Sequence, residues 1–225
     1  MKPMTEKHFS ILRRQMAEVI GIHTDLLEEE IGKGVIEEPV MKAMSRIPRH
    51  LFVPEPLAPL AYEDKPLPIG FGKTISQPFM CALMTDLLAL ERHDTVLEVG
   101  TGLGYQTAIL AELVGHVWSV EIVEEFAESA QLRLESFGYT NIDFRVGDGS
   151  RGWAEHGPFE KIIVAAAAED VPPALLEQLK PAGRLVMPLG PADAQYLTVV
   201  NKDATGGISS RAVIPVRFTR LETAM

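Results

Sequence analysis

The sequence has little of what disulfide-stabilised, metal-binding or membrane-spanning proteins require. It contains a single cysteine, Cys81, so no disulfide can form within the chain. Its six histidines are scattered and form no His-Glu-x-x-His pattern, and we therefore expect no metal site. No apolar run is long enough for a membrane span, and residues 1–14 lack the apolar core of a signal peptide. These absences predict a cytoplasmic protein with no membrane partner.

Basic residues are also in the minority. The 21 Lys and Arg residues face 31 Asp and Glu residues, which gives a net charge of −10. Such a charge disfavours broad binding to nucleic acid or anionic membranes. It remains compatible with a peptide substrate. The hydrophobic fraction of 46% and the charged fraction of 23% are those of an ordinary globular protein.

The hydrophobic pattern divides the chain into three parts of one expected domain, residues 1–225. Helical spacing covers residues 5–47, whereas seven of the 16 prolines fall between positions 48 and 78 and predict loops or extended segments there. The parts are a helical and loop extension (1–78), an α/β core (79–190) and C-terminal strands (191–225).

Strands alternate with helices through the core. A helix should start at Pro78, since proline favours the first turn. We expect strands at 95–99, 116–121, 142–147, 160–165 and 183–189, and helices at 105–114, 124–137 and 172–179. This order is typical of a doubly wound, mostly parallel α/β sheet. Two further strands, near 195–201 and 208–218, have no helix between them and predict an antiparallel edge.

The stretch Val96–Gly104 predicts a ligand cradle. A buried strand runs into the turn Gly100-Thr101-Gly102-Leu103-Gly104 and then into a helix. Glycines permit a tight turn and a close approach of ligand to backbone, and the helix start presents unpaired N–H groups.

The glycine spacing argues against a nicotinamide dinucleotide. The dinucleotide fingerprint needs a third small residue, but Tyr105 or Thr107 stands there. No tyrosine is followed four residues later by the lysine of short-chain dehydrogenases. Glu98 instead precedes the turn and Glu121 closes the next strand, a pattern that resembles S-adenosylmethionine-dependent methyltransferases. A carboxylate at Glu121 can accept both ribose hydroxyls of that cofactor.

In a parallel sheet, ligands bind beyond the carboxyl ends of the strands. That rule adds Ile122, which can cover an adenine face, and Asp148 and Gly149, where Asp148 can accept from the adenine amino group or instead form a local turn. The small residues at 165–168 either leave room beside a reactive centre or serve helix–sheet packing.

Longer motifs carry a narrower resemblance. The chain resembles the protein-L-isoaspartate O-methyltransferase family at the following motifs: Pro48-Arg49-His50, Phe52-Val53-Pro54, 61–64, 66–70, Thr74-Ile75-Ser76-Gln77-Pro78, Gly147-Asp148-Gly149, Gly152-Trp153, Pro158-Phe159, 183–190 and 215–218. They span nearly the whole chain.

The resemblance implies methyl transfer from S-adenosyl-L-methionine to the free α-carboxylate of L-isoaspartyl residues in damaged peptides and proteins, leaving S-adenosyl-L-homocysteine. The ester then closes to a succinimide that can hydrolyse to normal aspartate. The family's active-site serine matches Ser76, which could instead cap the helix after Pro78. The implied cofactor-binding residues are Thr74, Ile75, Glu98, Gly100, Thr101, Gly102, Gly104, Glu121, Ile122, Asp148 and Gly149.

Two features depart from the family pattern. Cys81 stands where some relatives have histidine, and Thr219-Arg220 replaces Val-Pro in the C-terminal motif. Arg220 is therefore a candidate for attracting acidic peptides. The alternatives are a methyltransferase for another carboxylate or small molecule, and an S-adenosylmethionine-binding protein without turnover. We expect a monomer.

Overall fold

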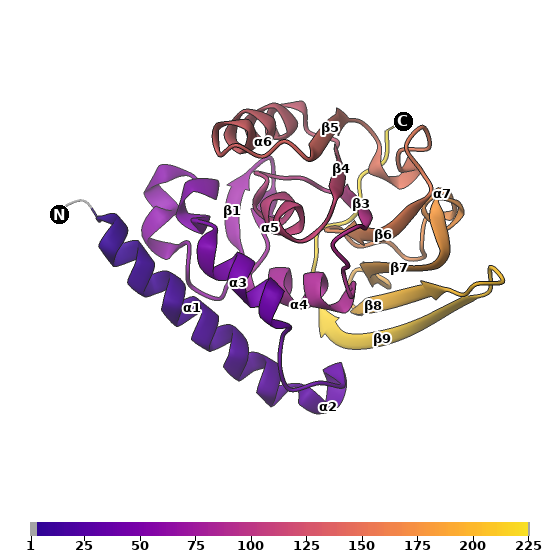
Figure 1. Cartoon of the computed structure of the whole chain (residues 1–225), viewed down its shortest axis with the longest axis horizontal. Helices are drawn as coiled ribbons and strands as arrows, with labels where there is room; N and C mark the ends of the chain where they lie inside the picture. Colours follow the sequence, from indigo (N-terminus) through magenta and orange to yellow (C-terminus); the bar gives the residue numbers. More distant parts are fainter. Residues whose placement is uncertain (1–3, 225) are drawn as a thin grey trace.

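A seven-stranded sheet organises the computed structural model, which describes residues 4–224 (Figure 1). The strand order is β5-β4-β3-β6-β7-β8-β9. The strands are β3 (Thr95–Val99), β4 (His116–Glu121), β5 (Ile142–Val146), β6 (Phe159–Val164), β7 (Leu179–Leu189), β8 (Gln195–Lys202) and β9 (Ile208–Val216). The first five in this order pair in parallel and the last two antiparallel. The predicted α/β class and its antiparallel edge are confirmed.

Alternating side chains of the strands build a core on each face of the sheet. On β3, Val96 joins one cluster, whereas Leu97 and Val99 join the other. On β6, Ile163 belongs to the first cluster and Ile162 to the second. A parallel strand buried on both faces explains why these segments read as continuous apolar runs.

Helices cover both faces. They are α4 (Pro78–Leu87), α5 (Tyr105–Leu113), α6 (Glu124–Ser136), α7 (Pro173–Glu177) and the short turn η3 (Gly149–Arg151). All ten residues of α4 are buried, because α4 lies between the sheet and the N-terminal helices. The helix α7 is shorter than the predicted 172–179, and β7 begins earlier than the predicted 183.

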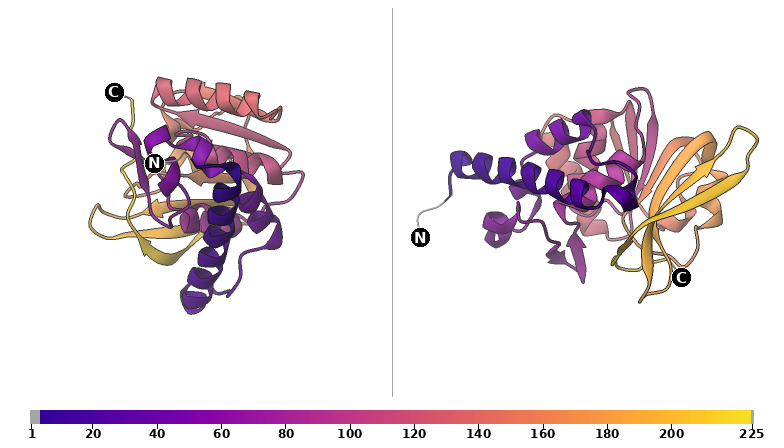
Figure 2. Two further views of the ribbon diagram at one scale, coloured as in Figure 1. Left: turned by 90° about the vertical axis from the view of Figure 1, so that its left-hand side faces the viewer. Right: turned by 90° about the horizontal axis from the view of Figure 1, so that it is seen from below.

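The N-terminal helices are α1 (Glu6–Leu26), α2 (Glu28–Ile31) and α3 (Glu38–Arg46). Helices α1 and α3 pack on α4, α3 also packs on α5, and α2 contacts β9. Figure 2 shows the length of α1 lying along this side of the molecule. Met16 and Met44 are fully buried and share one apolar cluster with Val96 and Ile109 of the α/β part. The helical prediction for residues 5–47 is confirmed. Across residues 4–224, every helix falls short of the length or apolarity that crossing a bilayer requires.

The proline-rich segment holds more structure than predicted. It contains two short 3-10 helices, η1 (Arg49–Phe52) and η2 (Glu55–Leu60), and a hairpin of β1 (Leu67–Gly70) and β2 (Lys73–Ile75). The hairpin turns through Gly70, Phe71 and Gly72, all with positive φ. Inward-facing Leu67, Ile69 and Ile75 bury one side of it. Its alternating apolar residues were the missed signal.

The strand order reverses at β3, since β4 lies on one side of it and β6 on the other. A switch point of this kind creates a crevice at the carboxyl ends of the strands. The predicted cradle follows β3 directly, so the fold places it at this crevice.

Candidate active site

The glycine turn needs glycine for two separate reasons. Gly100 has φ +96, and a Cβ there would lie 3.4 Å from the Ala165 Cβ. Gly104 has φ +88, and a Cβ there would lie 3.0 Å from the Leu134 Cδ1 and 3.2 Å from the Ala130 Cβ of α6. The left-handed backbone strains any larger residue at both positions, and close packing opposes one at Gly104 in addition. Gly100 thus permits the tight turn, whereas Gly104 lets α5 start against α6.

Glu121 fixes the turn from the neighbouring strand. Its Oε2 accepts from the Gly102 N–H at 2.8 Å and its Oε1 accepts from the Val123 N–H at 3.0 Å. The side chain is buried, with the residue 6% exposed. Each carboxylate oxygen retains a free lone pair, so the group can still accept hydroxyl donors of a ligand.

A second carboxyl lies behind the turn. Glu98 Oε2 accepts from the Thr107 and Ser119 hydroxyls, both at 2.6 Å, and Ser119 is joined in turn to the Thr101 hydroxyl at 2.6 Å. The Glu98 Oε1 is buried without a partner among the described residues. Burial raises the pKa of Glu98 to about 7, against the two hydroxyl hydrogen bonds, and the nearby Glu121 raises it further.

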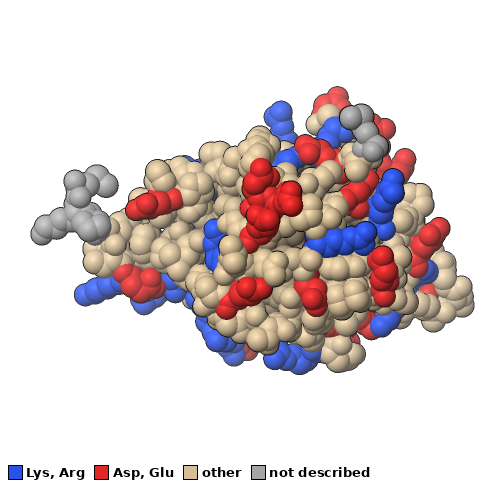
Figure 3. Space-filling view, turned by 90° about the horizontal axis from the view of Figure 1, so that it is seen from above, with Lys and Arg blue, Asp and Glu red and all other residues tan. Residues whose placement is uncertain are grey.

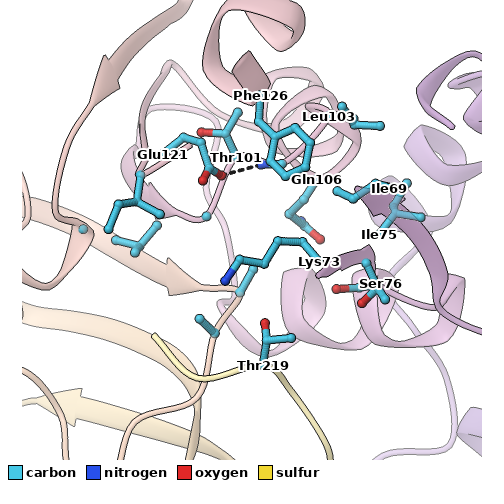
Figure 4. A pocket seen from close by; sticks show the side chains of 18 of the residues that line it. Ile69, Lys73, Ile75, Ser76, Thr101, Leu103, Gln106, Glu121, Phe126 and Thr219 are labelled. Carbon is cyan, nitrogen blue, oxygen red and sulfur yellow. Dashed lines mark hydrogen bonds between the residues drawn. The ribbon is translucent and has the colours of Figure 1, made fainter. Parts of the chain in front are cut away.

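A pocket lies at the crevice (Figure 4). It brings together nine of the residues predicted from the sequence, from the hairpin and from the ends of β3, β4 and β5. They are Thr74, Ile75, Ser76, Gly100, Thr101, Gly102, Glu121, Ile122 and Gly149.

Three predicted cofactor residues do not line this pocket. Glu98 lies behind the turn, and Gly104 serves the helix packing described above. The Asp148 carboxylate accepts from the Ser150 N–H at 2.9 Å and from the Ala224 N–H at 3.1 Å. Although burial acts to raise it, these hydrogen bonds keep the pKa of Asp148 below its ordinary value. The local-turn interpretation therefore describes Asp148 in this structure, and direct cofactor contacts of the three residues stay predictions.

A buried arginine holds the segment that carries Ser76. Arg49 is 0% exposed, and its Nη2 donates to the Ser76 carbonyl at 2.6 Å while its Nε donates to the Ala61 carbonyl at 2.7 Å. The guanidinium carbon lies 4.7 Å from the centre of the Tyr105 ring. The backbone of Ser76 is thereby anchored, and no partner of its hydroxyl was found within residues 4–224.

The residues after Ser76 bear on two features noted in the sequence, the helix cap and Cys81. Helix α4 has Gln77 as its N-cap without a side-chain hydrogen bond, so Ser76 does not cap it. Cys81 lines the pocket, but burial raises the pKa of its thiol to about 11. A protonated, buried thiol is a poor nucleophile.

Other residues also line the pocket, and most of them, apart from Ala165, Ala166 and Thr219-Arg220, had no clear signal in the sequence. They come from the hairpin, the glycine turn, α5, α6, the loop after β6 and a segment that follows β9. They include Ile69, Lys73, Leu103, Tyr105, Gln106, Phe126, Ala165, Ala166, Thr219, Arg220, Leu221 and Glu222. The hairpin tip reaches α6, where Phe71 packs edge-on against Phe126 at 5.3 Å between ring centres.

The segment 219–222, hereafter the C-terminal segment, is bound to the loop after β6. The Ala167 N–H donates to the Thr219 carbonyl and the Leu221 N–H donates to the Ala167 carbonyl, both at 2.8 Å. These bonds place the segment opposite the hairpin across the pocket. Within residues 4–224 no group of three or more His, Cys, Asp or Glu side chains is arranged to hold a metal ion.

Comparison with known proteins gives the family. A model of the protein-L-isoaspartate (D-aspartate) O-methyltransferase family matches residues 22–224. Protein-L-isoaspartate O-methyltransferase 1 of Polaromonas sp. is 54% identical over 98% of this chain and 94% of its own length. The chain belongs to this family. A second such enzyme, from Syntrophobacter fumaroxidans, is 50% identical over 95% of this chain and 87% of its own length.

Solved structures of the isoaspartate methyltransferase family share the fold. One protein-L-isoaspartate O-methyltransferase superposes with a TM-score of 0.79 at 27% identity, covering 92% of this chain and 65% of the other. Another, from Plasmodium falciparum and in complex with S-adenosyl-L-homocysteine, gives 0.74 at 24% identity, covering 90% and 99%. The family match starts at residue 22, so most of α1 precedes it.

Proposed function

We infer that this protein transfers a methyl group from S-adenosyl-L-methionine to the free α-carboxylate of L-isoaspartyl residues in damaged peptides and proteins. The observation that carries this function is one pocket that joins the glycine cradle with Glu121 to the Thr74–Ser76 segment. Family membership and relatives that bear this activity in their names support it.

The residues at the cradle fit the cofactor. Gly100–Gly102 would meet its amino-acid part, Glu121 its ribose hydroxyls, and Ile122 with Phe126 its adenine ring. When bound, the cofactor supplies an activated methyl group on a sulfonium sulfur. The partly apolar lining also suits a site that excludes water.

The chain has little acid–base chemistry to perform. An isoaspartyl carboxylate with an ordinary pKa near 4 is ionised at neutral pH and needs no general base. Its orientation toward the methyl group is then the main task. The Ser76 hydroxyl, on a backbone anchored by Arg49, is suited to hold one carboxylate oxygen. A neutral donor does this without the tight ion pair that would reduce the oxygen's nucleophilicity.

The decisive experiment uses radiolabelled methyl transfer to paired peptides that differ only in an isoaspartyl or a normal aspartyl linkage. We expect label on the isoaspartyl peptide alone. Ser76→Ala should lower kcat/KM by about 10- to 100-fold, since one hydrogen bond to a charged group is lost. Ser76→Thr should retain more activity, and calorimetry should show unchanged binding of S-adenosyl-L-homocysteine to both variants.

Other outcomes favour the alternatives. Cofactor binding without label on either peptide would favour another carboxylate substrate or a protein that binds S-adenosylmethionine without turnover. Equal labelling of both linkages would contradict the isoaspartyl specificity. Equal activity of Ser76→Ala and the unaltered chain would contradict the role of Ser76.

We also propose a single-domain cytoplasmic monomer whose macromolecular partners are its substrates. The single cysteine and the net charge of −10 support this setting and argue against nucleic-acid partners. Acidic and basic side chains are interspersed over the face that carries α6 (Figure 3). Light scattering at working concentration tests the monomer directly.

A further inference from the structure

Lys73 and Glu222 meet across the mouth of the pocket although 149 residues separate them. The Lys73 Nζ lies 2.5 Å from the Glu222 Oε1. Lys73 belongs to the hairpin and Glu222 to the C-terminal segment on the other side, and both line the pocket. In Figure 4, Lys73 extends from the hairpin into the pocket, with Ser76 and Thr219 nearby in the view.

The two partners differ in exposure. The Lys73 side chain is 19% exposed, whereas that of Glu222 is 56% exposed. The backbone beside Glu222 is fixed independently, by Leu221 bonded to Ala167 and by Ala224 bonded to Asp148. Glu222 can therefore leave Lys73 by a side-chain rotation that leaves the backbone in place.

Charge makes Lys73 the natural receptor for an anion. Two carboxylates line the pocket, Glu121 and Glu222, and two cations, Lys73 and Arg220. The Arg220 side chain is 70% exposed and pairs with Glu169 outside the lining. An approaching carboxylate is repelled by the two acidic groups and finds one largely covered cation, on the same hairpin segment as Ser76.

We propose that the Lys73–Glu222 pair is an exchangeable carboxylate latch, in which Glu222 occupies Lys73 until the carboxylate of the substrate replaces it. Lys73 is then a specificity-determining residue that attracts the isoaspartyl carboxylate, while Ser76 orients it for reaction. A partly exposed ion pair contributes little to stability, so exchange of one carboxylate for another is easy. This inference rests on the proposed function for the identity of the substrate.

The latch predicts KM changes of opposite sign. Lys73→Met should raise KM for an isoaspartyl peptide about 10-fold, because the attracting cation is gone. Glu222→Gln should lower KM about threefold, because the internal competitor is gone. In both variants kcat should stay within twofold, and Lys73→Arg should restore most of the affinity. The double variant should behave like Lys73→Met.

A matched control is the Lys65–Glu63 pair, which has the same 2.5 Å separation but lies outside the pocket. Lys65→Met and Glu63→Gln should leave KM unchanged. If the Lys73–Glu222 pair were only a tether, Lys73→Met and Glu222→Gln would shift KM in the same direction. If the enzyme methylates isoaspartyl peptide, a KM shift in the same direction in both variants would overturn the latch. The absence of a KM shift in both variants would also overturn it.

A binding measurement separates failure of the latch from failure of the proposed function. Reductive methylation with ¹³C-formaldehyde gives Lys73 an NMR signal, assigned by its loss in Lys73→Arg. The signal should shift on adding isoaspartyl peptide and not on adding the same peptide with its α-carboxylate amidated. A shift without methyl transfer would retain the latch and contradict the activity; equal responses to both peptides would contradict the latch.

Discussion

The two sides of the pocket are built in different ways. On the cofactor side, strand ladders continue into the loops: the Gly100 N–H donates to the Val120 carbonyl at 2.8 Å and the Ala165 N–H to the Val99 carbonyl at 2.9 Å. On the substrate side, the hairpin and the C-terminal segment meet through the side chains of Lys73 and Glu222. Backbone ladders hold one geometry, whereas exposed side chains exchange partners. We therefore expect substitutions on the cofactor side to have the larger effects.

The strongest test of this difference is Glu121→Ala. The substitution removes the acceptor of the Gly102 and Val123 N–H groups and the buried carboxylate that faces the ligand. Losing two or more charge-assisted hydrogen bonds should make the free energy of S-adenosyl-L-homocysteine binding less favourable by about 4 kcal/mol. Its affinity should then fall roughly 1000-fold. Calorimetry measures this affinity, and Glu121→Gln is expected to bind with an affinity between those of the unaltered chain and Glu121→Ala. Binding within tenfold of the unaltered chain would show that the turn holds without Glu121.

A smaller effect concerns pH. Burial raises the folded-state pKa of Glu98 to about 7, above the value of about 4.5 in the unfolded chain. Between these values the folded chain binds more protons than the unfolded chain, so stability is lost as pH rises. From pH 5 to pH 8 the loss is roughly 2 to 3 kcal/mol. Glu98→Gln should remove it, as measured by urea unfolding of both proteins at the two pH values.

Glu222→Gln is the matched control on the substrate side. Its pair with Lys73 is partly exposed, so the substitution should change the free energy of unfolding by less than about 0.5 kcal/mol. The Glu98 prediction has its own contradicting outcome. If Glu98→Gln shows the same pH dependence of stability as the unaltered chain, that dependence belongs to other groups.

The same contrast explains what the sequence could predict. The cradle follows from local rules, because glycines after a buried strand and a carboxylate at the next strand end are adjacent in any parallel sheet. Gly100, Gly102 and Glu121 were predicted in this way, and all three line the pocket. Glu98 was placed correctly on its strand, but its side chain bonds to Thr107 of α5 and does not line the pocket. The alternation of side chains along a strand predicts what a given side chain faces only when the position of the strand relative to the helices is known.

The substrate side resisted prediction because its contacts join distant parts of the chain. Nothing near Glu222 in the sequence indicates that it meets Lys73. The hairpin was hidden by its prolines, which predict loops, although Ile69 and Ile75 alternate as strand residues do. Ser76 was found through a family motif, and the Arg49 side chain that anchors it emerged only from the folded structure.

Substitution of Arg220 should have the smallest effect of those considered. It most clearly separates an exposed cation of the substrate side from the covered Lys73. Its side chain is 70% exposed and its partner Glu169 is 68% exposed, at 3.3 Å. Water and salt screen such a charge, so Arg220→Ala should change the kcat/KM ratio of acidic to neutral isoaspartyl peptides by less than about twofold. Lys73→Met should instead raise KM for both peptides, since both carry the α-carboxylate. A tenfold loss of preference for acidic peptides in Arg220→Ala would place selectivity at the exposed rim, and the covered Lys73 would then not be the dominant cation of the substrate side.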